Sequence, residues 1–224
     1  MRCPGLILFF LLIAGRPSAS AQLVFAPVAG GVPVTLPHSL FDSSLNDSIE
    51  IDVLRCYIGP VELLQGGKTV YRLQRPYFLI DADVPASMQL ALPGGIRYDS
   101  LRFGLGVDSL TSVSGVFSGD LDPVNGMYWT WQSGYINFKM EGSSQKMKTL
   151  NGRFQFHVGG YLPPFNTSRT IQVAAGQDGR TVVRIDIPAL LKRINLAQTP
   201  VLMSPGEKAV EFADILTAVF KSGF

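Results

Sequence analysis

A succession of short β-type segments, each bounded by glycine or proline, is the feature that most limits the fold of this chain. Residues 49–58, IEIDVLRCYI, are rich in β-branched side chains and are followed by turn residues. Leu101, Phe103 and Leu105 recur at every second residue, which places them on one face of a strand. Comparable segments are TVYRLQ, PYFLIDA, YWTWQSGYINFKMEG, GRFQFHVGGY, TIQVAA and TVVRIDI. Strands at this spacing predict a mainly β fold, a β-sandwich-like single domain.

Three further patterns complete the fold prediction. The sequence GQDG lies between TIQVAA and TVVRIDI, an arrangement that predicts a β-hairpin. Residues 204–221 are predicted to form a C-terminal helix, with Ser204 as its N-cap and Glu207 completing a capping box. A shorter helix is predicted at 188–195, PALLKRIN. We expect the C-terminal helix to pack on the sheet.

The N-terminus has the features of a secretory signal peptide. A basic residue precedes an apolar stretch at 6–14, and Ala19 and Ala21 form an A-x-A cleavage pattern before Gln22. The apolar stretch is too short to anchor the chain across a bilayer. We therefore expect residues 1–21 to be removed and the mature chain to be periplasmic or secreted.

Charge and cysteine content exclude several classes of protein. Loss of Arg2 and Arg16 with the signal peptide leaves 17 of the 19 basic residues against 17 acidic residues. The mature chain thus lacks the basic surplus that nucleic-acid binding requires. Cys3 leaves as well, so Cys56 has no cysteine partner within the chain. Because Cys56 lies in a strand-like segment, a small buried hydrophobic side chain is favoured over a metal or redox role.

Both tryptophans of the chain lie in GMYWTWQSGY, residues 126–135. In a strand, Trp129 and Trp131 point to one face and Tyr128 to the other. Two indoles on one face bury a large apolar area, so core packing is the favoured interpretation. The alternative is a functional aromatic face of Trp129, Trp131 and Tyr135, with an oxidisable tryptophan near a metal.

The chain has two histidines, His38 and His157. In RFQFHVGGY the phenylalanines share one face, and His157 projects from the other, beside a glycine pair that permits close approach. Imidazole suits copper, zinc, iron and nickel, so His157 is a candidate metal ligand; the alternative is a surface histidine without a metal. His38 lies in TLPHSLFDSS, a proline-bounded loop, where a solvated side chain is favoured over a ligand.

The sequence lacks the motifs of common enzymes. There is no G-x-S-x-G nucleophile elbow, no H-E-x-x-H and no P-loop. The carboxylate pairs at 81–83 and 120–122 lie beside turn residues, which favours solvated turns over a catalytic or calcium site. We therefore expect a binding protein rather than an enzyme.

Three stretches of the chain resemble the MbnP-like family, whose members are periplasmic or secreted copper-binding proteins associated with methanobactin. These stretches are LDPVNGMYWTWQSGYINFKMEG, GRFQFHVGGY and LMSPGEKAVEFADILTAVF. The pattern Trp-x-Trp-x-x-Gly-Tyr is the most specific, and F-x-F-H-x-G comes second. The resemblance runs from Ile49 to the C-terminus, and Ile-Asn-Phe-Lys-x-Glu-Gly is similar to the Bacteroidetes-type branch.

The resemblance implies a function outside the cytoplasm. It implies a β-sandwich-like domain over residues 22–224 that binds copper, as Cu(I), through histidine and in some members through a tryptophan-derived kynurenine. It also implies a di-haem partner enzyme of the MauG or cytochrome c peroxidase type. His157 matches the histidine of the F-x-F-H strand and is the best candidate ligand. Trp129 and Trp131 match the aromatic pair of the family, and neither is assigned as the modified residue.

Two stretches depart from the family pattern. Where relatives carry Trp or His before an L-x-D stretch, this chain has PYFLIDAD, with Tyr77 and Phe78. Where some relatives have Asn-His ahead of the Trp-rich strand, this chain has DSLTSVSG. His38, Cys56 or a methionine could then complete a soft Cu(I) site, because thiolate and thioether suit that ion.

The sequence leaves two functions open. The first is copper handling outside the cytoplasm with His157 as a ligand. The second is a metal-free binding module that holds a protein or a small ligand on the face of Trp129 and Trp131 or in a cleft beside it. If His157 is a ligand, its second ring nitrogen should have a carbonyl or carboxylate partner. A soft or imidazole donor close to His157 would favour the first function.

Overall fold

The computed structural model describes residues 21–42, 46–130 and 132–223, and its strands form two sheets. The strands of the smaller sheet are β1 (Ala21–Ala29), β2 (Val32–Pro33), β7 (Gln89–Leu92), β13 (Arg180–Asp186) and β15 (Phe220–Ser222). Those of the larger sheet are β3 (His38–Asp42), β4 (Asp47–Gln65), β5 (Lys68–Arg72), β6 (Phe78–Asp81), β8 (Ser100–Leu105), β9 (Tyr128–Thr130), β10 (Gly134–Ser144), β11 (Arg153–Gly159), β12 (Arg169–Ala174) and β14 (Val201–Leu202).

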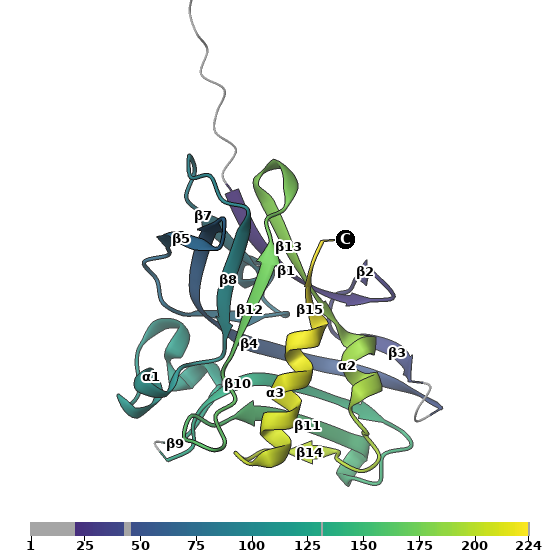
Figure 1. Ribbon diagram of the computed structural model, residues 1–224. Helices are drawn as coiled ribbons and strands as arrows, with labels where there is room; N and C mark the ends of the chain where they lie inside the picture. Colours follow the sequence, from purple (N-terminus) through teal and green to yellow (C-terminus); the bar gives the residue numbers. More distant parts are fainter. Residues whose placement is uncertain (1–20, 43–45, 131, 224) are drawn as a thin grey trace, which may run out of the picture.

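Helices are few and lie outside the sheets (Figure 1). The α-helices are α1 (Ser109–Val113), α2 (Ile187–Arg193) and α3 (Glu207–Val219), and the 3-10 turns are η1 (Pro85–Met88), η2 (Gly119–Leu121), η3 (Pro123–Asn125), η4 (Leu150–Gly152) and η5 (Gln177–Gly179). The predicted mainly β fold with a helix near the C-terminus is confirmed.

The long strand β4 organises the larger sheet. Its first half pairs with β3 on one side and β10 on the other, and its second half pairs with β5, β6 and β8. From β10 the sheet continues to β11 and β14, and from β8 it continues to β12. Leu54 and Cys56 of β4 face the main core, whereas Tyr57 belongs to a separate apolar cluster.

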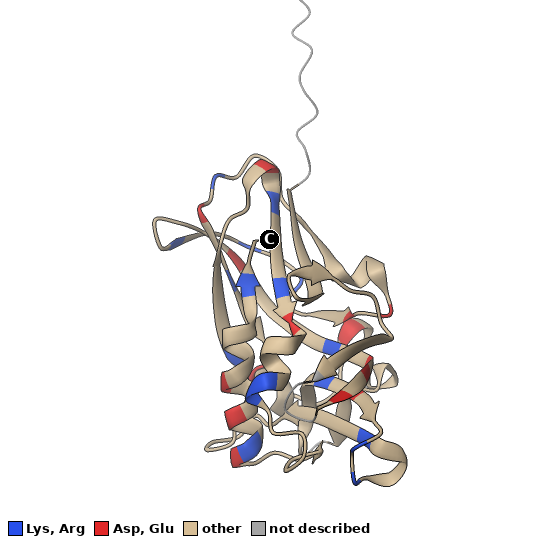
Figure 2. Cartoon of the chain, turned by 90° about the vertical axis from the view of Figure 1, so that its right-hand side faces the viewer, with Lys and Arg blue, Asp and Glu red and all other residues tan. Residues whose placement is uncertain are grey.

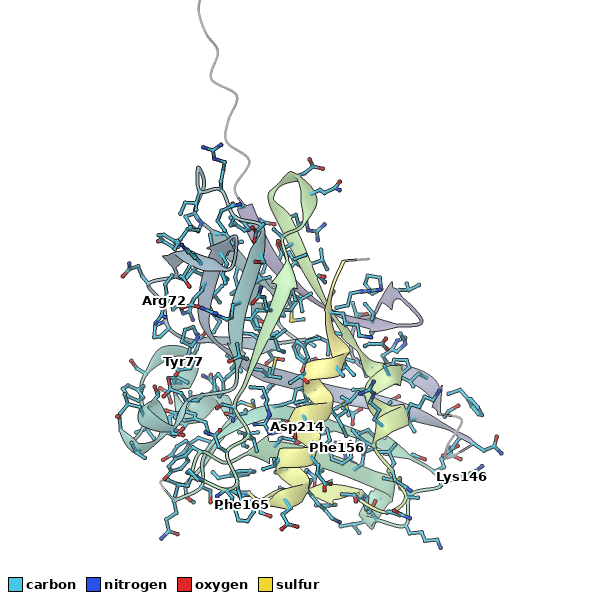
Figure 3. All side chains as sticks on the ribbon, in the orientation of Figure 1. Arg72, Tyr77, Lys146, Phe156, Phe165 and Asp214 are labelled. Carbon is cyan, nitrogen blue, oxygen red and sulfur yellow. The ribbon has the colours of Figure 1, made fainter. Side chains whose placement is uncertain are left out.

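The main core lies between the two sheets and under α3. Phe212 of α3 packs against Phe138 of β10 and Phe156 of β11, with ring centroids 5.9 and 5.1 Å apart. Figure 3 labels Phe156 beside the ribbon of α3. Phe25 of the smaller sheet meets Phe103 of the larger sheet edge to face, at 5.5 Å. Burial of these rings therefore joins both sheets and the helix into one core.

A second cluster lies on the opposite face of the larger sheet, which we call the outer face. The segment 107–135, with α1, η2, η3 and β9, covers this cluster. Its buried members, the outer cluster, are Tyr57, Tyr77, Val107, Leu121, Met127, Tyr135 and Ile136, with Leu79, Tyr128 and Trp129 packed against them. The larger sheet is thus apolar on both faces at this end.

The predicted hairpin around GQDG is wrong. The strand before it, β12, pairs with β8 of the larger sheet, whereas the strand after it, β13, pairs with β1 and β15 of the smaller sheet. The positive φ angles of Asp178 (56°) and Gly179 (77°) do make a tight turn. That turn carries the chain from one sheet to the other, because each strand finds its apolar partners far away in the sequence.

The C-terminal helix is shorter than predicted, and its capping box is wrong. The carbonyl oxygen of Gly206 accepts from the backbone N–H groups of Ala209 and Val210, each at 3.1 Å. The helix therefore begins at Glu207, after the N-cap Gly206, and Ser204 lies before the cap. The shorter helix predicted at 188–195 is present as α2.

The N-terminal strand β1 has no clear signal in the sequence. Most of its nine residues are buried, and it pairs with β13 in parallel on one side and with β7 in antiparallel on the other. The predicted signal peptide lies outside the described residues, except for Ala21. Ala21 and Gln22 are the first residues of β1, opposite Leu92 and Ala91 of β7.

Gly142 permits a close approach of three strands. The register of β10 on β4 shifts there, from Glu141 opposite Val53 to Gly142 opposite Ile51. A Cβ atom on Gly142 would lie 2.1 Å from the carbonyl oxygen of Glu50. It would also lie 2.5 Å from a ring carbon of Phe154. No larger residue fits without movement of the backbone.

We predict that Gly142→Ala lowers the free energy of unfolding by about 1–3 kcal/mol, the usual cost of overpacking. The control is Gly104→Ala on β8, where the nearest heavy atom would be 3.4 Å from the new Cβ, an ordinary contact. Urea unfolding of both variants checks this. Equal losses of stability would show that the close approach at Gly142 is not the cause.

Candidate functional site

His157 lies on the outer face of the larger sheet. Phe154, Phe156 and Val158 of β11 point into the main core, so alternation turns the His157 side chain the other way, as the sequence predicts. The histidine is nevertheless 7% exposed. It is therefore a buried polar side chain outside the main core, which needs a hydrogen-bond partner.

Charged side chains extend from His157 across the sheet. His157 lies opposite Lys139 of β10, which lies opposite Arg55 of β4. Acidic groups flank this row, with Asp81 Oδ2 2.8 Å from Arg55 Nε and Glu141 Oε1 3.2 Å from Lys139 Nζ. Figure 2 shows basic and acidic positions interspersed over the sheets and α3. The row is thus neutralised locally.

Glu141 holds the His157 ring. The Nε2 atom of His157 lies 2.7 Å from Glu141 Oε1, and among the described residues this is the hydrogen bond that the ring makes. The other oxygen of Glu141 lies 3.5 Å from Arg153 Nη2, and Arg153 also pairs with Asp52 at the register shift of β4. The carboxylate partner expected for a metal-binding histidine is therefore present.

The charge states of this pair favour a metal-binding form. Burial, with the nearby Lys139, holds the pKa of His157 below its ordinary value although Glu141 opposes the shift. Burial alone would raise the pKa of Glu141, but the hydrogen bonds from His157 and Lys139 outweigh it and lower that pKa. At neutral pH a neutral imidazole thus donates Nε2–H to an ionised carboxylate, which leaves the lone pair of Nδ1 free.

Trp129 covers the position next to His157. Gly159 lies two residues after His157 in β11, so both are on the outer face. Two carbon atoms of the Trp129 indole would lie 2.8 and 3.2 Å from a Cβ atom placed on Gly159. The glycine thus permits the close approach that the sequence predicts. The Trp129 Nε1 atom is buried and has no hydrogen-bond partner among the described residues. Trp131 lies outside the described residues, so its shared face with Trp129 stays a prediction.

Tyr135 is a packing residue of the outer cluster. It is 1% exposed, and its ring meets Tyr57 at 5.7 Å and Tyr128 at 4.9 Å in edge-to-face contacts. Its hydroxyl donates to the backbone carbonyl of Leu121 at 3.1 Å. The phenol is therefore satisfied internally and presents no free surface to a ligand.

His38 is remote from His157. It begins β3 and pairs with Ile51 of β4, so the predicted loop is in fact the start of a strand. The strands β4 and β10 separate β3 from β11, which places the two histidines at least about 14 Å apart at the usual strand spacing. Ile51 belongs to the main core, so His38 also lies on the other face of the sheet. The structure does not bring the two histidines together.

Cys56 also lies on the other face. It is fully buried in the main core, between Phe138 of β10 and Ile80 of β6, and burial raises the pKa of its thiol. This is the environment of a small hydrophobic side chain. Of the methionines, Met127 is the one placed in the outer cluster, together with Trp129.

The two stretches that depart from the family pattern meet in the fold. The hydroxyl of Tyr77, from PYFLIDAD, lies 2.5 Å from Asp108 Oδ2 and 3.1 Å from Thr111 Oγ1, both from DSLTSVSG. The result is a hydrogen-bonded cluster of oxygen atoms rather than of imidazoles. Among the described residues, no group of three or more His, Cys, Asp and Glu side chains is arranged to hold a metal ion.

The donors on the outer face therefore limit which metal could bind there. Besides carboxylates such as Glu141, they include the imidazole of His157 and the buried thioether of Met127. A nitrogen and a soft sulfur fit Cu(I) better than the harder divalent ions. No closed site of three or four protein ligands is formed by the residues that the structure describes.

Glu141 and Lys139 are site residues that the sequence analysis did not single out. Alternation in INFKMEG does place Lys139 and Glu141 on one face of β10. That Lys139 lies opposite His157 and Glu141 opposite Gln155, within reach of the histidine ring, depends on the register of β10 against β11, which no local pattern reveals.

Comparison with known proteins bears on this site. A family model described as MbnP matches residues 18–204. The solved structure of MbnP from Methylosinus trichosporium is similar, with a TM-score of 0.60 at 17% sequence identity, over 84% of this chain and 81% of that chain. At this identity the similarity shows the fold alone. No curated protein matches the sequence.

Within the described residues, no helix has the length and apolar character needed to cross a bilayer. The family model matches far more than half of the sequence, and the similar solved structure carries the same family name. The chain belongs to the MbnP family.

Proposed function

We propose that this protein is exported and handles copper, as Cu(I), through the imidazole of His157. The observation that carries the proposal is the hydrogen bond between His157 Nε2 and Glu141. Histidines that bind metals commonly donate their second ring N–H to a carboxylate, which fixes the tautomer and the ring orientation. Membership of the MbnP family supports copper as the metal.

The residues around His157 have separate tasks in this proposal. Glu141 orients the ring so that Nδ1 faces the metal, and burial keeps the imidazole neutral at physiological pH. Met127 supplies a thioether from the outer cluster, and Trp129 shields the neighbouring position from water. Bound Cu(I) would be coordinated by these soft and nitrogen donors.

An incomplete protein ligand set suits transfer of copper better than permanent storage. An ion held by few protein donors can be completed by a ligand from another molecule and then released to it. The di-haem enzyme of the MauG or cytochrome c peroxidase type remains a partner predicted by this proposal. Export through the N-terminal signal peptide belongs to the same proposal, because it would place the protein where such partners act.

A metal-free binding module is the second candidate function. The observation in its favour is the oxygen cluster of Tyr77, Asp108 and Thr111. This cluster joins the two stretches that the resemblance identified as departing from the family pattern. A cavity of about 600 Å³ beside this cluster could hold a small ligand. Both candidates describe a binding protein rather than an enzyme.

We predict about one copper per chain in protein purified from its native host, and loss of that copper in His157→Ala, because the principal ligand is removed. His38→Ala is the matched control and should keep its copper, since His38 lies on the other face. Met127→Leu conserves volume and should weaken binding without abolishing it. Elemental analysis of the folded proteins measures each value.

Two outcomes would contradict the copper proposal. Native protein without copper, even after incubation with Cu(I), would exclude copper handling and favour the binding module. Equal copper in His157→Ala and the parent protein would exclude His157 as the ligand.

We also predict that Glu141→Ala weakens copper binding about 10- to 100-fold, the usual effect of losing the partner of a ligand histidine. Glu141→Gln should weaken it less, because the amide oxygen still accepts the Nε2–H bond. Competition titration with a Cu(I) chelator measures both affinities, with circular dichroism as the check on folding. Unchanged affinity in Glu141→Ala would remove its orienting role.

A further inference from the structure

A cavity of about 600 Å³ lies between the start of β6 and the segment that covers the outer cluster. Its apolar walls come from Pro60, Pro76, Tyr77, Phe117 and Leu121. Tyr77, labelled in Figure 3, lies close to the ribbon of α1 in that view. The volume suits a small organic molecule, and apolar walls with a few polar groups are usual for such sites.

Three charged residues, Arg75, Asp108 and Asp120, belong to the described lining of this cavity. Arg75 forms an ion pair with Asp120, and its guanidinium lies 4.8 Å from the centroid of the Phe78 ring. The positive charge is thus already matched by one carboxylate. The negative charge of Asp108 is left over, so the lining carries a net charge of one negative unit.

An anionic ligand fits this lining poorly. Asp120, which pairs with Arg75, is itself held in place because its second oxygen accepts from the backbone N–H of Leu79 at 2.7 Å. An anion bound to the remaining N–H groups of Arg75 would therefore lie beside a fixed carboxylate. An anion would also face two carboxylates in a partly buried space.

Asp108 provides a fixed negative charge next to an aromatic ring. Its Oδ1 accepts from the backbone N–H of Thr111 at 2.7 Å, and its Oδ2 accepts from the Tyr77 hydroxyl. Burial would raise the pKa of Asp108, but these hydrogen bonds outweigh it and lower that pKa. Burial and the bond to Asp108 raise the pKa of Tyr77 to about 12, so the phenol stays neutral. An ionised carboxylate retains further acceptor positions for a ligand.

We propose that this cavity binds a small organic amine, with its protonated nitrogen beside Asp108 and its apolar body between Tyr77 and Phe117. Cations are attracted to aromatic faces, and a neighbouring carboxylate adds to that attraction. Phe117 is 43% exposed, so a ligand body would cover an apolar ring that now faces solvent. The site is argued without copper, because its polar contacts involve Tyr77, Asp108 and Thr111, whereas His157 is hydrogen-bonded to Glu141.

Three probes of similar shape test the charge preference. Benzylamine, benzyl alcohol and benzoate are titrated into the exported protein at pH 7 and followed by NMR or calorimetry. We expect a Kd of about 1 mM or tighter for benzylamine. Benzyl alcohol should bind at least about fivefold more weakly because it lacks the cation. Benzoate should show no binding at the same concentrations.

Variants then locate the site. Asp108→Asn removes the charge, while its amide oxygen can still accept from the backbone N–H of Thr111 and its NH2 group can donate to the Tyr77 hydroxyl. It should weaken the binding of benzylamine about tenfold with little effect on the binding of benzyl alcohol. Asp186→Asn is the matched control, because Asp186 caps α2 through the backbone N–H of Ala189 and lies outside the cavity. Phe117→Ala should weaken the binding of both benzylamine and benzyl alcohol.

The proposal is overturned by any of three results. The first is that benzylamine does not bind. The second is that benzoate or benzyl alcohol binds as tightly as benzylamine. The third is that Asp108→Asn and Asp186→Asn bind benzylamine with equal affinity. Because copper content is measured separately on the same protein, failure of this proposal and failure of the copper proposal are distinguishable.

Discussion

The pairing of β4 with five other strands is the constraint on which the rest of the structure depends. Alternate side chains of β4 point to opposite faces of the sheet. Leu54 and Cys56 lie in the main core, whereas Arg55 and Tyr57 lie on the outer face. The strands β10 and β11 follow the same alternation through their hydrogen bonds. A slip of one residue would exchange the two faces, so the register that buries the core also fixes the place of His157.

The register shift opposite Gly142 adds a second constraint. It leaves Asp52 without a partner on β10, and Asp52 pairs instead with Arg153 of β11. Arg153 in turn approaches Glu141, the residue that holds His157. Half-buried charges are tolerated when each has a partner, which explains why this part of the outer face carries basic and acidic groups in contact. A local defect in strand pairing therefore supports the orientation of the candidate ligand.

Local patterns predict the strands and the faces of their side chains, but they do not predict partners. The alternation around Phe154 and Phe156 correctly placed His157 outside the main core. The sequence predicts that a metal-binding His157 has a carbonyl or carboxylate partner, but it does not predict that this partner is Glu141. That assignment requires the register of β10 against β11. The GQDG turn was predicted as a hairpin because turn chemistry is local, whereas the choice of sheet depends on long-range burial. The strand β1 gives no alternation because it is covered on both faces.

The separation of the two faces decides which donors can meet a metal. A thiol must lose its proton to bind copper well, and burial in the main core opposes this at Cys56. Reaching that sulfur would also require opening the main core, in which Cys56 is fully buried. The imidazole of His157 needs no such change, because it is already neutral and already oriented by Glu141. Under the copper proposal, His157 on the outer face is therefore better placed to bind the ion than Cys56 in the main core.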